Sequence, residues 1–144
     1  MKTSAFINQL DEAKVVAEIA KAEAGTSGEI RVFVSSRHVD DPVARAEKRF
    51  EKLGMTNTAL RNGVLLYFAP VSRKFAIVGD RGIHEKCGPG FWSEIIEDIR
   101  PLLQTGHFTD AVTMAVRRAG EQLARHFPAE HGDRDELSNE IVGE

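Results

Sequence analysis

Residues 61–92 read RNGVLLYFAPVSRKFAIVGDRGIHEKCGPGFW and contain two apolar runs separated by a short turn. The runs, 62–69 and 73–79, are too short for typical helices and too continuously apolar for a sheet with one face in water. We therefore expect two central strands that are covered on both faces. If they form an antiparallel hairpin, the polar residues at 61–63 and 79–82 meet at the same edge of the sheet.

Four helices and one further strand are expected around this hairpin, from the spacing of apolar residues. Asp41 and Pro42 mark a helix start, Thr109 is expected to cap the last helix, and Pro101 should bend or end the third. The expected elements are helices over 8–24, 42–53, 91–104 and 109–125 and a strand over 29–35. The pattern predicts an α/β fold, a three-layer α/β/α sandwich with a small central mixed β-sheet flanked by about four helices.

Length and charge point to one ordinary globular domain. The chain has 144 residues and a net charge of −3, and six acidic side chains and one arginine fall in its last 16 residues. We expect a single domain over 1–128 and a flexible acidic tail over 129–144. The basic residues form no patch for nucleic acid, and no run approaches the roughly 18 apolar residues of a membrane span. The N-terminus has no signal-peptide pattern, so we expect the cytoplasm.

Several segments in this order resemble one known family. They are SGEIRVFV at 27–34, NGVLLYFA at 62–69, FAIVGDRGIHEK at 75–86, GPGFW at 88–92 and a helix that ends in GxxLxxxFP at 120–128. Together they resemble the TPM domain over residues 10–128, and the GDRGIHEK variant is most similar to the family's bacterial branch. The resemblance implies an α/β/α sandwich, divalent-cation binding as suggested for some members, and a weak acid phosphatase activity as proposed for the plant branch.

Asp80 is the first candidate site residue, because it follows the second hairpin strand in a glycine-rich turn. A carboxylate there suits Mg²⁺ or Ca²⁺, which take oxygen ligands and, for Mg²⁺, keep some waters. Glu29 and Glu85 are the nearest further carboxylates by topology, and Asn62 is the nearest amide. A second interpretation stays open, in which Asp80 and Asn62 only satisfy backbone groups of the turn.

Arg61 and Arg81 are candidate anion-binding residues, because a guanidinium presents a planar fork of donors to paired oxygens. They fit equally well as ion-pair partners of Asp80, and such surface pairs contribute little. His84 is a candidate general acid or base beside Asp80, although an isolated exposed histidine is more often inert.

Other sequence features limit the enzymatic interpretations. Cys87 is the single cysteine and lacks an arginine six positions on, where Ser93 stands, so a thiol phosphatase is excluded. No HExxH helix or phosphate-binding GxxxxGK loop is present. Any hydrolysis would be metal-assisted, with Asp80 holding the cation. Two main hypotheses remain: a non-catalytic module that binds a divalent cation or an unknown protein partner, and a weak metal-dependent phosphatase. A third interpretation is a domain whose acidic tail and paired C-terminal helices mediate assembly.

Overall fold

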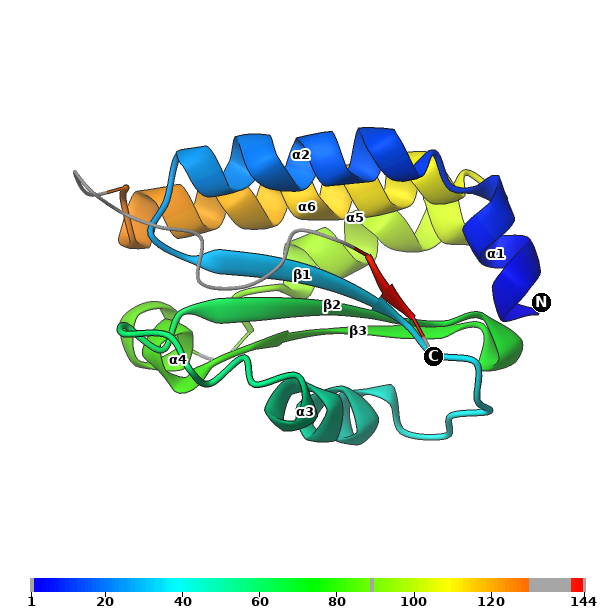
Figure 1. The fold of residues 1–144 in the computed structure, drawn as a ribbon, viewed down its shortest axis with the longest axis horizontal. Helices are drawn as coiled ribbons and strands as arrows, with labels where there is room; N and C mark the ends of the chain where they lie inside the picture. Colours follow the sequence, from blue (N-terminus) through cyan, green and yellow to red (C-terminus); the bar gives the residue numbers. More distant parts are fainter. Residues whose placement is uncertain (1, 89, 130–140, 144) are drawn as a thin grey trace.

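A computed structural model of the chain describes residues 2–88, 90–129 and 141–143, and Figure 1 shows a sheet with helices on both faces. The strands are β1 (Glu29–Val34), β2 (Gly63–Ala69), β3 (Lys74–Gly79) and β4 (Val142–Gly143). The helices are α1 (Thr3–Gln9), α2 (Glu12–Ala24), α3 (Pro42–Lys52), α4 (Arg81–Cys87), α5 (Ser93–Gln104) and α6 (Phe108–His126), with a 3₁₀ turn η1 (Pro70–Ser72). This arrangement confirms the expected α/β sandwich.

The sheet is mixed, with strand order β3-β2-β1-β4. β1 and β2 are parallel, and β2 and β3 form the expected antiparallel hairpin, in which Val64 pairs with Gly79. β3 lies at an edge of the sheet, so the expectation of two central strands is correct only for β2. All seven residues of β2 are buried, whereas β3 begins with an exposed lysine and a half-buried phenylalanine.

Alternate residues of β1 and β2 enter two separate parts of the core, because successive side chains of a strand point to opposite faces. Ile30, Val32 and Val34 of β1 pack with residues of α1, α2, α5 and α6. Phe33 of β1 and Tyr67 of β2 stack on the other face at 5.5 Å between ring centroids, over the part of the core that α3 covers. Burial on both faces explains why β2 reads as a continuous apolar run.

The structure corrects two expected helix starts and shows that Pro101 does not end its helix early. The first helix is two helices, because the chain turns at Leu10 and Asp11 then caps α2 by accepting a hydrogen bond from the backbone of Lys14 at 3.1 Å. Thr109 does not cap α6 but lies inside it, and its hydroxyl accepts a hydrogen bond from the Asp11 backbone at 3.0 Å. Pro101 lies inside α5, which continues to Gln104.

The far end of the expected tail takes part in the sheet. Val142 and Gly143 form β4 and pair in parallel with Phe33 and Val34 of β1, whereas we expected 129–144 to be flexible. Residues 130–140 and 144 of that expected tail lie outside the described residues. Among the helices that the structure describes, none is long and apolar enough to cross a membrane.

Helices α2 and α6 approach each other so closely at Gly120 that a side chain there should destabilise the fold. A Cβ at Gly120 would lie 2.5 Å from the Cβ of Ala22, well inside van der Waals contact. We expect Gly120→Ala to lower the free energy of unfolding by about 2 kcal/mol through overpacking, measured by urea denaturation. Adding Ala22→Gly should recover part of that loss, and a double variant no more stable than Gly120→Ala would contradict the assigned contact.

Candidate functional site

Asp80 lies where β3 ends and α4 begins, at the edge where the hairpin brings its polar residues together. Its backbone N–H donates to the carbonyl of Gly63 at 2.9 Å, which extends the β2–β3 ladder by one residue. Its side chain is only 5% exposed, and one carboxylate oxygen accepts a hydrogen bond from the backbone of Arg81 at 2.7 Å. Asp80 is therefore the N-cap residue of α4.

Arg61 holds the same carboxylate with two nitrogens. Its Nε donates to Oδ2 of Asp80 at 2.7 Å and its Nη2 donates to Oδ1 at 2.9 Å, which is the bidentate geometry of a strong charge-assisted pair. The hydrogen bonds with Asp80 raise the pKa of Arg61 above its ordinary value, and the charge of Glu85 acts in the same direction. Arg61 also adopts a left-handed backbone, with φ of 51°, which is uncommon outside glycine.

Gly82 adds a backbone contact between α4 and the segment that contains Arg61. Its N–H donates to the carbonyl of Arg61 at 2.9 Å, and a Cβ on it would lie 2.3 Å from the carbonyl oxygen of Leu60. Only glycine fits this distance between the start of α4 and the segment that leads into β2. We call Arg61, Asp80 and Gly82 the α4 clasp, since together they tie α4 to the start of β2.

Asn62 and Glu29 lie beside the clasp but inside the fold. Asn62 is 1% exposed, and its Nδ2 donates to the hydroxyl of Ser27 at 3.2 Å. Its Oδ1 is buried with no hydrogen-bond partner among the described residues. Glu29 is also buried, and its backbone pairs with Gly63 across the β1–β2 ladder.

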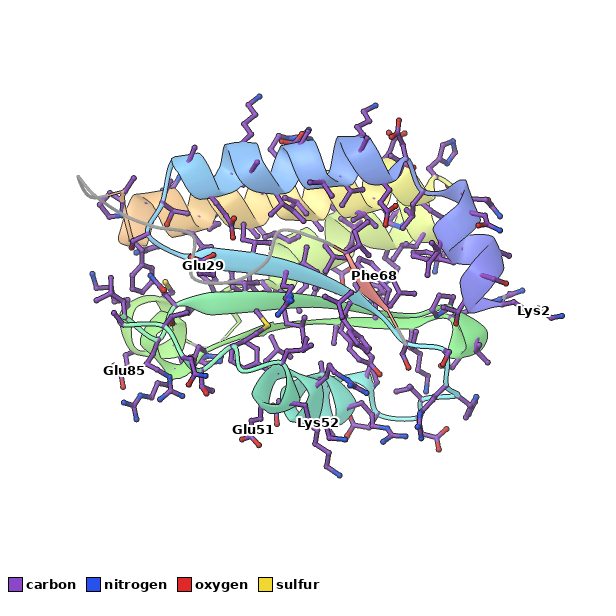
Figure 2. All side chains as sticks on the ribbon, in the orientation of Figure 1. Lys2, Glu29, Glu51, Lys52, Phe68 and Glu85 are labelled. Atoms are coloured by element: carbon purple, nitrogen blue, oxygen red, sulfur yellow. The ribbon has the colours of Figure 1, made fainter. Side chains whose placement is uncertain are left out.

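The three carboxylates expected to share a metal do not converge. Figure 2 shows Glu29 beside β1 and Glu85 apart from it on the outer side of α4. Asp80 lies at the junction of β3 and α4 and forms an ion pair with Arg61. In the part of the chain that the structure describes, no three His, Cys, Asp or Glu side chains are grouped as a metal site would require.

Arg81 and His84 are exposed on the first turns of α4. Within the described residues, neither side chain forms a hydrogen bond or ion pair with Asp80, whereas Arg61 forms two hydrogen bonds with it. Of the two arginines expected to bind an anion, Arg61 thus pairs with a carboxylate of the same chain. The backbone carbonyl of His84 accepts a hydrogen bond from Gly88 at the end of the helix.

The sequence interpretation missed α4 and read its first residues as a glycine-rich turn. The signal was available, because Asp80 is a preferred N-cap type and Ile83 and Cys87 follow at helical spacing. Ile83 is fully buried, and burial raises the pKa of the Cys87 thiol, which favours the unreactive protonated form. Cys87 therefore helps to pack α4 against the core and is not a reactive thiol.

Comparisons with known proteins agree on the family and the fold. The family model described as the TPM domain matches residues 1–122. The NMR structure of the BA42 protein from the psychrophilic bacterium Bizionia argentinensis is 38% identical, with a TM-score of 0.85 over 92% of each chain. The N-terminal domain of a protein from P. gingivalis is 18% identical, with a TM-score of 0.59 over 80% of this chain and 76% of that one. No curated protein matches the chain.

Proposed function

The chain belongs to the TPM domain family, and from that premise we propose that it is a binding module without turnover, whose α4 clasp responds to divalent cations. The observation that supports the absence of turnover is that the Asp80 carboxylate is already fully occupied within the fold. Both of its carboxylate oxygens accept hydrogen bonds from Arg61, and one also accepts the bond that caps α4.

The same observation weakens the phosphatase alternative. Metal-assisted hydrolysis needs a carboxylate that holds the cation and a second group that moves the proton. Asp80 is already neutralised by a guanidinium, and no described hydrogen bond links the exposed His84 side chain to it. A catalyst built on these two residues would first have to break the clasp.

A divalent cation would act at the clasp by competing with Arg61. Asp80 and Glu85 both act on the guanidinium, so two negative charges lie near one positive charge. Mg²⁺ and Ca²⁺ bind through one or two carboxylates and waters, and either would offer Asp80 a partner of higher charge. Binding would release Arg61 and loosen the tie between α4 and the start of β2.

An NMR titration with Ca²⁺ and Mg²⁺ tests this competition. In the wild-type protein we expect saturable shifts of the backbone amides of 80–85 and of the Arg61 Nε–H at millimolar ion. Arg61→Gln removes the competing charge and should tighten cation binding about tenfold, whereas Arg81→Gln, also on this edge, should change it little. A wild-type protein without shifts, or equal affinities in both variants, would contradict the proposal.

A turnover assay separates the module from the enzyme. With p-nitrophenyl phosphate and Mg²⁺, wild-type protein and Asp80→Asn should both hydrolyse substrate at the rate of buffer alone. Asparagine suits this test, because it caps helices as well as aspartate and keeps α4 in place. Measurable turnover that disappears in folded Asp80→Asn would establish the phosphatase instead.

A further inference from the structure

A cavity of about 550 Å³ lies at the end of the sheet opposite the α4 clasp. It is open to solvent on one side and lined by residues of α1, the ends of β2 and β3 with the turn between them, the last turns of α5 and the start of α6. Figure 2 shows Phe68, which lines it, far along the sheet from Glu29 and Glu85. Its volume is within the range of about 300–1,000 Å³ that is usual for small-molecule sites.

The wall of the cavity is a connected group of phenylalanines. The ring of Phe6 lies 4.9 Å from that of Phe108 and 5.8 Å from that of Phe68, measured between centroids. Phe75 continues the group at 6.4 Å from Phe68. Four aromatic rings from α1, α6, β2 and β3 therefore back the cavity, with Phe75 half-buried and the other three at most 9% exposed.

The charged side chains that line the cavity are all positive. Among the residues that the structure describes, Arg73, Lys74 and Arg100 line the cavity and no acidic residue does, and all three cations are exposed at its rim. The contacts that Lys74 and Arg100 make within the protein do not neutralise their charges, so both can still bind an anion. The Lys74 Nζ donates to the backbone carbonyl of Asp40 at 2.7 Å, and the Arg100 guanidinium lies 5.4 Å from the centre of the Phe75 ring.

Two features of Arg100 and Arg73 favour an anionic ligand at this rim. Arg100 makes a long ion pair with Glu97 at 4.0 Å, between side chains that are 49% and 75% exposed, and such a pair is weak. Arg73 has a left-handed backbone with φ of 55°, directly before β3. Strained backbone of this kind collects at ligand sites, and here it positions a cation at the mouth of an apolar cavity.

We propose that this cavity binds a small organic anion with an apolar body, its rings or chain against the phenylalanines and its carboxylate between Arg73, Lys74 and Arg100. Charge complementarity selects this class: a guanidinium fork pairs with two oxygens, whereas a neutral head group gains no ion pair and a cationic one is repelled. The site is distinct from the α4 clasp and does not depend on a divalent cation.

Three ligands with one apolar body and different head groups test the proposal on the full chain. At pH 7, 4-phenylbutyrate should give saturable NMR shifts at the amides of 73–75 and 103–108. We expect 4-phenylbutanol to bind about tenfold more weakly and 4-phenylbutylamine to give no saturable shifts, as expected from loss and reversal of the ion pair. Equal binding of all three ligands, or shifts spread over the whole molecule, would overturn the proposal.

Variants locate the site and exclude other occupants. Arg100→Gln should weaken 4-phenylbutyrate about fivefold, whereas Arg117→Gln, an exposed arginine away from the cavity, should leave it unchanged. Gln104→Trp places a ring over the exposed mouth and should abolish binding while the protein remains folded. Unchanged binding in folded Gln104→Trp would overturn the assignment of the site. Shifts at 73–75 that depend on protein concentration and not on ligand would also overturn it, because they would mean that a second copy of the chain binds there.

Discussion

Asp80→Ala should lower the free energy of unfolding by about 3 kcal/mol, which is large for one side chain. The substitution removes the cap of α4, which is worth about 1 kcal/mol. It also removes both hydrogen bonds from Arg61, of a kind that contributes more than neutral ones. The aspartate is 5% exposed whereas Arg61 is 31% exposed, so water can replace the lost contacts on the arginine side only.

Asp41→Ala is the matched control for this prediction. Asp41 is also a helix N-cap, and its Oδ1 accepts a hydrogen bond from the backbone of Ala44 at 3.1 Å, but it is exposed. We expect its loss to cost about 1 kcal/mol, the usual value of a cap. Urea denaturation followed by circular dichroism measures both variants. If Asp80→Ala proves no more destabilising than Asp41→Ala, then Asp80 is only a cap and the clasp contributes nothing further.

Gly82→Ala is expected to have an equally large effect, for a steric reason. The added Cβ would lie 2.3 Å from the carbonyl oxygen of Leu60 and 2.6 Å from that of Arg61, and both are backbone atoms that a rotamer change cannot move. Alanine is the better helix former by about 1 kcal/mol, so propensity alone predicts a gain. We instead expect a loss of about 3 kcal/mol, at the upper end of overpacking costs.

The control for Gly82 is a glycine with space around it. At Gly25, after the end of α2, an added Cβ would meet its nearest neighbour at 3.7 Å, which is ordinary contact. Gly25→Ala should therefore change the free energy of unfolding by less than about 1 kcal/mol. Thermal unfolding of the two variants compares them directly, and a Gly82→Ala protein as stable as the wild type would contradict the close approach at the clasp.

The hairpin and its polar edge were predictable from sequence because they rest on local patterns. Two short apolar runs on either side of a turn specify antiparallel strands, and that geometry brings Arg61 near Asp80 without further information. Asp41 and Pro42 likewise start α3 as predicted. The ion pair between Arg61 and Asp80 was one of the stated alternatives, and the structure shows its bidentate geometry.

Other features depend on contacts between distant parts of the chain and left no local pattern. The turn between α1 and α2 is fixed by Thr109, about 100 residues away, whose hydroxyl bonds to Asp11 and to the carbonyl of Gln9. β4 forms because Val142 and Gly143 pair with the edge of β1 that β2 does not cover. The cavity at the opposite end is lined by residues from distant parts of the chain, so the sequence of any one segment does not reveal it.

The α4 clasp predicts a specific non-additivity between Arg61 and Asp80. The measurement is the free energy of unfolding, in buffer with EDTA, of the wild type, Arg61→Gln, Asp80→Asn and the double variant. Because Asn keeps the cap, the cycle reports the ion pair. We predict that Asp80→Asn costs less than half as much in the Arg61→Gln background as in the wild type. Equal costs in both backgrounds would mean that the two residues act independently, and would contradict the clasp.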